Sequence, residues 1–166
     1  MKRKSDHIFL LENTPEKVLA AHALAEESIR KIAESEYLVA KTGIPPYCVW
    51  ISREEDLHDF VYQIPDLAWD MLEYAEEPLE ILYPQIKFIS PLQESAETHI
   101  SIRMVRGKKL ADFVRRHGPL LAFPMIEQHD QVNWIDETHD LREKEKAYDR
   151  VKTMKLNRDN SFTFVR

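Results

Sequence analysis

The sequence predicts a single domain of the α/β or α+β class, in which a mixed sheet is flanked by helices. The 166 residues fit one domain of ordinary size, and a hydrophobic fraction of 43% is enough for a buried core. Short apolar runs typical of strands alternate with segments of helical periodicity, and neither a repeat nor a low-complexity stretch interrupts them. This alternation favours a mixed architecture over an all-helical or an all-β domain.

The N-terminal part of the chain predicts a strand followed by helical structure. The apolar run at 8–11 is a short strand candidate. Asn13 or Thr14 can cap a helix and Pro15 suits its first turn, because the first helical position needs no N–H donor. Apolar residues then recur at mostly helical spacing, so we expect one long or two short helices that end near Tyr37.

The next segment predicts a strand and two helices. The apolar run at 47–52 favours a strand, after Gly43 and two prolines have ended the preceding helical region. Ser52 followed by Glu55 matches the capping-box pattern at the start of a helix. Pro65 opens a second helix, which carries an apolar stripe along one side.

Further along the chain, apolar and alternating runs predict strands at 79–83, 86–89, 99–104 and 120–123. The run at 99–104 alternates between apolar and polar residues, whereas the run at 120–123 is continuously apolar, as a central strand would be. Between these two runs, helical spacing predicts a helix at 108–117 that Gly118 ends.

The last part of the chain is dense in charge. One helix is expected from Leu141 to about Met154, and the run at 162–165 could add an edge strand. We therefore divide the single domain into a core at 8–126 and a charged C-terminal extension at 127–166.

Composition and charge argue against several classes of function. Only three glycines are present, so a glycine-rich loop that cradles phosphate is not expected. The net charge of −6 is not that of a general nucleic-acid binder, which carries a basic excess. Basic side chains nevertheless gather within 103–116, where they form either a solvated helix face or a local basic surface.

The single cysteine and the N-terminus bear on the cellular compartment. Cys48 rules out an internal disulfide, and its place in an apolar run predicts a buried, unreactive thiol. The apolar run behind the basic N-terminus stops at Glu12, too early for a signal sequence or a membrane span. We therefore expect a cytoplasmic protein with no membrane contact.

No Gly-x-Ser-x-Gly elbow is present in the sequence, so Ser-His-Asp catalysis finds no support.

Several segments occur in the order and spacing of one known family. Residues 77–84, Glu-Pro-Leu-Glu-Ile-Leu-Tyr-Pro, look like its Gly-Pro-Leu-Thr-Leu-Ile-Leu-Pro segment. Residues 100–104, Ile-Ser-Ile-Arg-Met, look like its Val-Ala-Val-Arg-Met strand, and 118–122 look like its Gly-Pro-Leu-Ala-Ala strand. Helical segments at matching places are 26–32, 65–74 and 108–117. Over about residues 8–126 the chain thus resembles the YrdC-like threonylcarbamoyl-adenylate synthases, which implies a single domain with a twisted mixed sheet flanked by helices.

The family's functional residues do not carry over. Its members make threonylcarbamoyl-adenylate from threonine, bicarbonate and ATP for a tRNA modification. Their threonine-binding segment falls on 12–19, where neither threonine matches and Lys17 replaces the tyrosine. Their Lys-x-Arg falls near Lys41, so one cation at most survives, and their Ser-x-Asn falls on 124–126, Pro-Met-Ile. Adenylyl transfer needs cations on the phosphates and donors that orient the nucleophile. We therefore expect no synthase activity, no catalytic residue and no cofactor.

The candidate ligand contacts are four basic side chains. Arg103 projects from the strand at 99–104 and matching family members keep an arginine there, so the resemblance implies a ligand contact; a surface or salt-bridged arginine is the alternative. Lys41, Arg53 and His117 could join it around one groove. The first hypothesis is therefore a catalytically degenerate YrdC-like module that binds a nucleotide or a short RNA segment.

The tail is rich in side chains that can bind a metal. Imidazole and carboxylate ligands suit zinc, iron or manganese, and these types crowd a short stretch: Glu127, His129, Asp130, Asp136, Glu137, His139 and Asp140. No helical His-Glu-x-x-His is present, and a solvated acidic loop is the simpler interpretation, so no metal site is assigned. A metal-dependent hydrolase and a protein-interaction domain are the alternatives to the binding module.

Overall fold

The sheet of this protein runs through the whole molecule in the computed structural model, which describes residues 3–13, 16–34, 47–84, 87, 99–125, 134–143, 151–157, 159 and 161–165. These residues form one sheet of nine strands in the order β7-β1-β2-β6-β3-β5-β4-β8-β9. In chain order the strands are β1 (Ile8–Asn13), β2 (Glu16–His22), β3 (Cys48–Ile51), β4 (Leu79–Pro84), β5 (His99–Met104), β6 (Leu120–Pro124), β7 (Glu137–Asp140), β8 (Lys152–Leu156) and β9 (Phe162–Val165).

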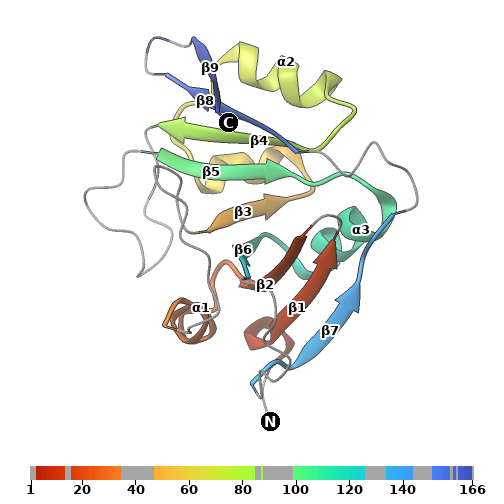
Figure 1. Ribbon diagram of the computed structural model, residues 1–166. Coiled ribbons are helices and arrows are strands. Elements are labelled where there is room, and N and C mark those ends of the chain that lie inside the picture. The colour runs from red at the N-terminus through yellow and green to blue at the C-terminus, as the bar shows by residue number, and fades with distance from the viewer. Residues whose placement is uncertain are drawn as a thin grey trace.

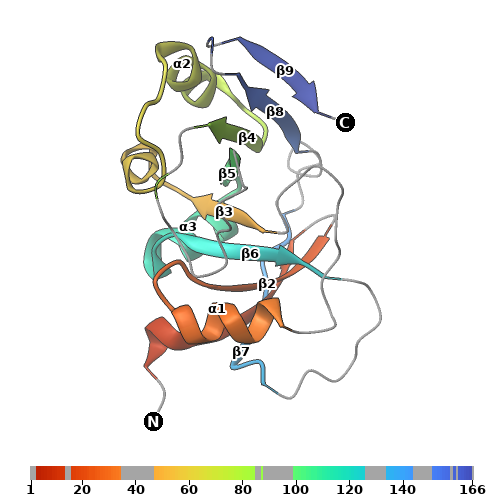
Figure 2. The same ribbon diagram turned by 90° about the vertical axis from the view of Figure 1, so that its left-hand side faces the viewer.

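The sheet is mixed, as predicted, and helices cover both of its faces (Figures 1 and 2). Strand β3 pairs in parallel with β5, β1 with β7 and β4 with β8, and the remaining neighbours are antiparallel. The helical elements are η1 (Lys4–Asp6), α1 (Glu26–Ala33), η2 (Glu54–Asp59), α2 (Asp66–Tyr74) and α3 (Lys108–His117), where η denotes a 3₁₀ helix.

The helices pack on the sheet through apolar stripes. Leu110, Phe113 and Val114 of α3 recur at helical spacing and are buried against one face of β1, β2, β3 and β6. The opposite face is covered by α1, η2 and α2, whose apolar residues join those of the strands in a second core cluster. Alternate residues of β1, β2, β3 and β6 face alternate clusters, which makes β2 and β3 buried on both sides.

Several predicted elements are confirmed. Helix α3 spans the predicted residues, and Gly118 follows it at a φ of 83° that favours glycine. Strands β4, β5 and β6 lie where the apolar runs placed them, and β9 forms an edge of the sheet. The strand candidate at 86–89 falls outside the described residues except for Lys87, as does the predicted helix end near Tyr37.

The helix predicted to start at Pro15 is wrong for residues 16–22, which form strand β2. This strand lies between β1 and β6 and is antiparallel to both. Leu19 and Ala21 are buried on one side of it, and Val18 and Ala20 on the other. Burial of both faces outweighs the helical propensity of the alanines. Helix α1 starts later, at Glu26, where two glutamates favour the positive end of the helix dipole.

The capping box predicted at Ser52 is also wrong. The segment forms the 3₁₀ helix η2, whose N-cap is Arg53 and which has no side-chain capping bond. Helix α2 begins after Pro65, close to its predicted start. Among the described helices, none is long and apolar enough to span a membrane.

The predicted helix from Leu141 to Met154 is wrong at both of its described ends, because residues 141–143 are not helical and residues 152–154 belong to strand β8. Met154 pairs with Ile81 of β4, and the side chains of Met154 and Leu156 are buried, whereas Lys155 between them is exposed. This alternation has the period of a strand. The acidic stretch that was interpreted as a loop contains strand β7, which pairs with β1. Residues 144–150 lie outside the described part.

Candidate functional site

Three large side chains form a row across strands β3, β5 and β4. They lie on the same face of the sheet as helix α3, which covers β1, β2, β6 and β3. Trp50 of β3 is paired in register with Arg103 of β5, which is paired with Glu80 of β4. Because residues in register on neighbouring strands point to the same face, the three side chains lie beside one another. All three residues are buried, with exposed fractions of 1%, 7% and 8%.

Arg103 and Glu80 form a buried ion pair. The Arg103 Nε and Nη2 atoms donate hydrogen bonds of 3.2 Å and 3.0 Å to Glu80 Oε1. Burial alone would raise the pKa of Glu80, but the charge of Arg103 and hydrogen bonds from Cys48, Arg103 and Ser101 outweigh it. The pKa of Glu80 is therefore lowered, and the carboxylate is ionised at neutral pH.

Arg103 also contacts an aromatic ring. Its guanidinium carbon lies 5.2 Å from the centroid of the Trp50 ring, within the range of a cation–π interaction. The indole Nε1–H of Trp50 is buried and has no hydrogen-bond partner in the part of the chain that the structure describes. A buried donor of this kind is costly unless an acceptor reaches it.

Two small polar side chains complete the polar cluster, which comprises Cys48, Trp50, Glu80, Ser101 and Arg103. Ser101 of β5 donates to the sulfur of Cys48 on β3 over 3.5 Å. Burial, followed by the charge of Glu80, raises the pKa of the Cys48 thiol well above its usual value. Cys48 is therefore a thiol rather than a thiolate, and it lacks the character of a nucleophile, as predicted.

The other predicted ligand contacts lie elsewhere. Arg53 is exposed at the start of η2. His117 ends α3, and its ring packs against Phe9 and Phe113 at centroid distances of 5.0 Å and 4.3 Å. Three strands, β2, β6 and β3, separate Phe9 on β1 from Arg103 on β5, so His117 and Arg103 do not share one groove. Lys41 lies outside the described residues.

Sequence reasoning missed Glu80, the partner of Arg103. A signal was present, because Glu80 interrupts an apolar strand that pairs with the strand of Arg103. A carboxylate and a guanidinium on the same face of neighbouring strands are expected to meet. The missing information was the pairing of β4 with β5 and its register, which the sequence alone does not provide.

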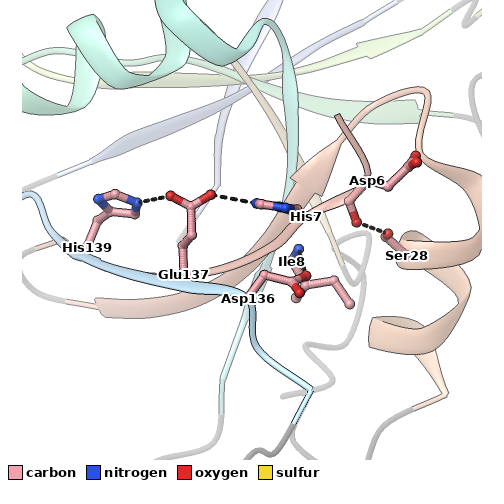
Figure 3. A network of polar contacts seen from close by, with 7 residues as sticks. All are labelled: Asp6, His7, Ile8, Ser28, Asp136, Glu137 and His139. Carbon is pink, nitrogen blue, oxygen red and sulfur yellow. Dashed lines mark hydrogen bonds and ion pairs between the residues drawn. The ribbon is translucent and has the colours of Figure 1, made fainter. Parts of the chain in front are cut away.

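The carboxylate of Glu137 joins two histidines in a second polar cluster (Figure 3). His7 Nδ1 lies 2.8 Å from Glu137 Oε2, and His139 Nε2 lies 3.2 Å from Oε1. The hydrogen bond with His7 is the largest influence on Glu137 and holds its pKa below the usual value. Nearby, Asp136 Oδ2 accepts a 2.7 Å hydrogen bond from the Ile8 backbone. These contacts fasten β7 to β1.

This arrangement does not make a metal centre. The two histidines bind opposite oxygens of one carboxylate, so their ring nitrogens do not converge on one point (Figure 3). Across the described residues, no group of three or more His, Cys, Asp or Glu side chains is arranged to hold a metal ion. Glu127, His129 and Asp130 of the predicted ligand-rich stretch fall outside the described part.

Comparison with known proteins identifies the fold. No family model matches the sequence, and no curated protein does. The structure resembles that of the H234A/Y235A variant of P. abyssi Sua5, with a TM-score of 0.74 and 16% identity over 97% of this chain. It also resembles MTH1692 from Methanobacterium thermoautotrophicum, with a TM-score of 0.61 and 13% identity over 97% of this chain and 80% of that one.

Full-length HypF contains a similar region. In its phosphate- and nucleotide-bound form it matches 98% of this chain with a TM-score of 0.69 and 12% identity, over 27% of its own length. This chain spans about half of P. abyssi Sua5, at 52% in the variant and 47% in the complex with L-threonine. The order of strands and helices and these matches together show that the chain has the YrdC-like fold.

Proposed function

We propose that this chain is a YrdC-like module that binds a phosphate-bearing ligand, a nucleotide or an RNA segment, without threonylcarbamoyl-adenylate synthase activity. The observation that carries the loss of synthase activity is the ion pair of Arg103 with Glu80 inside a YrdC-like sheet, whereas the exposed cations of helix α3 carry the binding role. In the segment that this chain resembles, the synthases have an uncharged threonine at the place of Glu80. A carboxylate here neutralises a cation that could otherwise act on a phosphate.

The residues at the end of β6 support the loss of synthase activity. Met125 occupies the central position of the Pro-Met-Ile segment that replaces Ser-x-Asn. The backbone N–H of Met125 donates a 3.1 Å hydrogen bond to the Lys17 carbonyl oxygen, and the Met125 side chain packs against the apolar core. Pro124, the last residue of β6, stands at the place of the serine and has no hydroxyl with which to orient a nucleophile or bind a phosphate oxygen.

The relatives support a ligand-binding role for the scaffold. P. abyssi Sua5 has been observed with L-threonine, and HypF with phosphate and nucleotide. Those observations belong to those proteins, which share 12–16% of their residues with this chain in the matched regions. They make a small anionic or nucleotide ligand the first class to test.

Helix α3 supplies cations for phosphate contact. Lys108, Arg115 and Arg116 are exposed, and their spacing of seven and eight residues places them on one side of the helix. Arg115 forms an exposed ion pair of 3.3 Å with Asp112 on the same side. Exposed pairs of this kind are weak, so a phosphate can displace the carboxylate.

Calorimetric titration with ATP, AMP and a short single-stranded RNA tests the proposal and separates its two ligand sources. We expect binding of at least one probe and a decrease of its affinity with salt. Replacing Arg115 and Arg116 by Gln should lower the slope of log K against log salt by about two, whereas Lys152→Gln on β8 serves as the matched control.

Two results would overturn the proposal in different ways. Absence of binding to all three probes would remove the binding function. Release of pyrophosphate when the protein is mixed with L-threonine, bicarbonate and Mg-ATP would show that adenylyl transfer survives.

A further inference from the structure

The Arg103–Glu80 pair lies at the edge of the protein interior rather than in a sealed core. The side chain of Arg103 is 9% exposed and that of Glu80 is 11% exposed. The two hydrogen bonds described between Arg103 and Glu80 both end on Oε1 of the carboxylate. The pair borders solvent, and the carboxylate also receives hydrogen bonds from Cys48 and Ser101, so several donors surround one anionic group.

The polar cluster around this pair is rich in donors. Arg103 offers a guanidinium, Trp50 an indole N–H, Ser101 a hydroxyl and Cys48 a thiol. Glu80 is the one carboxylate among these five side chains. The indole N–H has no acceptor in the described part of the chain, although the residue is 1% exposed. A group of buried donors with one anionic acceptor matches the chemistry of an oxyanion site.

A purely structural role explains such a pair poorly. Removing two charges from water carries a desolvation cost, and their mutual attraction often does no more than offset this cost. Apolar residues of similar size would hold β4 and β5 together as well. The arrangement is more readily explained if Arg103 is the recognition group and Glu80 regulates it.

We propose that Glu80 is a built-in counter-anion that occupies the place of the acid group of a small oxyanion ligand at Arg103. The ligand class is a carboxylate or a phosphate, and Glu80 sets the specificity by keeping Arg103 occupied, so that an anion binds the guanidinium only where it takes the place of the Glu80 carboxylate. The inference deepens the proposed function, on which it rests, by assigning the residue that controls access of an anion to the polar cluster.

Chemical rescue tests this role directly. Glu80→Ala removes the carboxylate and leaves space for a small anion, while Glu80→Gln keeps the shape and removes the charge. The melting temperature of each variant is measured in sodium chloride, formate, acetate, phosphate and pyrophosphate at equal ionic strength. Comparing the carboxylates with the phosphates identifies which source of oxyanion the position takes.

We expect Glu80→Ala to melt below the wild type in chloride and to recover by about 3–6 °C in at least one oxyanion, because an anion that binds only the folded state stabilises it. The wild type should show no such difference between salts. The double variant Glu80→Ala/Arg103→Met should not respond either, because it lacks the guanidinium that binds the anion.

Equal melting temperatures of Glu80→Ala in chloride and in every oxyanion would overturn the proposal. An equal response of the double variant would overturn it as well. If neither single variant folds in any of the salts, the oxyanions have failed to replace the carboxylate, and the proposal is also overturned. The titrations of wild-type protein with nucleotides and RNA are independent of these measurements, so failure of the binding function and failure of the counter-anion role are distinguishable.

Discussion

Ser101 donates a hydrogen bond to the sulfur of Cys48 across strands β5 and β3, over 3.5 Å. The Cys48 sulfur in turn lies 3.6 Å from the carbonyl oxygen of Val49. The hydrogen bond from Ser101 by itself favours the thiolate, but burial and the charge of Glu80 outweigh it and raise the pKa of the lone cysteine, which is therefore protonated.

The buried thiol should react slowly. Burial and the charge of Glu80 raise the pKa of Cys48 well above its usual value, and the thiolate is the reactive form. At pH 8 we expect iodoacetamide to modify Cys48 in the native protein about a hundredfold more slowly than in urea, because reaction requires opening of the sheet. Mass spectrometry of quenched samples measures both rates. Similar native and denatured rates would contradict the buried position.

Removing one member of the Arg103–Glu80 pair should cost more than removing both. Arg103→Met leaves an unpaired carboxylate among buried side chains and should lower the free energy of unfolding by about 3–5 kcal/mol. The double variant Arg103→Met/Glu80→Leu should recover most of that loss, because no buried charge remains. Urea denaturation of the two variants and the wild type gives the comparison. A double variant less stable than Arg103→Met would contradict the ion pair.

Gly118 should resist substitution. Its φ is 83° and its ψ is −177°, a conformation that side chains rarely adopt, and an added Cβ would lie 2.9 Å from His22 Nε2. We expect Gly118→Ala to lower the free energy of unfolding by about 1–3 kcal/mol. In a His22→Ala background the loss should be smaller but still present, since the backbone strain remains. Equal stability of Gly118→Ala and the wild type in urea would contradict this geometry.

The attachment of β7 should weaken in acid. Because the folded-state pKa of Glu137 is lowered, the unfolded chain binds more protons at pH values between the folded and unfolded pKa. The contribution of Glu137 is therefore fully present above its usual pKa of about 4.3 and is lost as the pH falls below it.

The measurement is the difference in unfolding free energy between the wild type and Glu137→Gln from pH 7 to pH 3. This difference should shrink toward zero at the acid end. Glu73→Gln, at an exposed position of α2, is the control and should show little difference at any pH. A difference that grows as the pH falls would have the wrong sign for this hydrogen-bonded carboxylate.

The sequence was sufficient to place a helix or strand wherever one local pattern dominated. Helix α3 has an apolar stripe and a glycine stop, and strand β5 alternates between faces, so each was correctly placed. Strand β2 was missed because its alanines favour a helix, while its burial between β1 and β6 is a long-range effect. Strand β8 was missed for a similar reason, since its pairing with β4 joins residues far apart in the chain.

The candidate site was predictable only in part. Arg103 was identified from its strand pattern and from the resemblance, but its pairing with Glu80 depends on the register between β4 and β5. The histidines and carboxylates at 127–140 suggested metal ligands, whereas Glu137 binds the side chains of His139 and His7. Composition shows which groups are present, and topology decides which of them meet.

Both outer borders of the sheet come from the last part of the chain. Strand β7 pairs with β1 at one edge of the sheet. At the other edge, strand β8 pairs with β4 and strand β9 pairs with β8. During synthesis, a nascent chain that has reached only β6 leaves the backbone N–H and C=O groups of β1 and β4 available to strands of other molecules. Emergence of residues 137–165 from the ribosome is thus the step that protects β1 and β4 from intermolecular β-pairing.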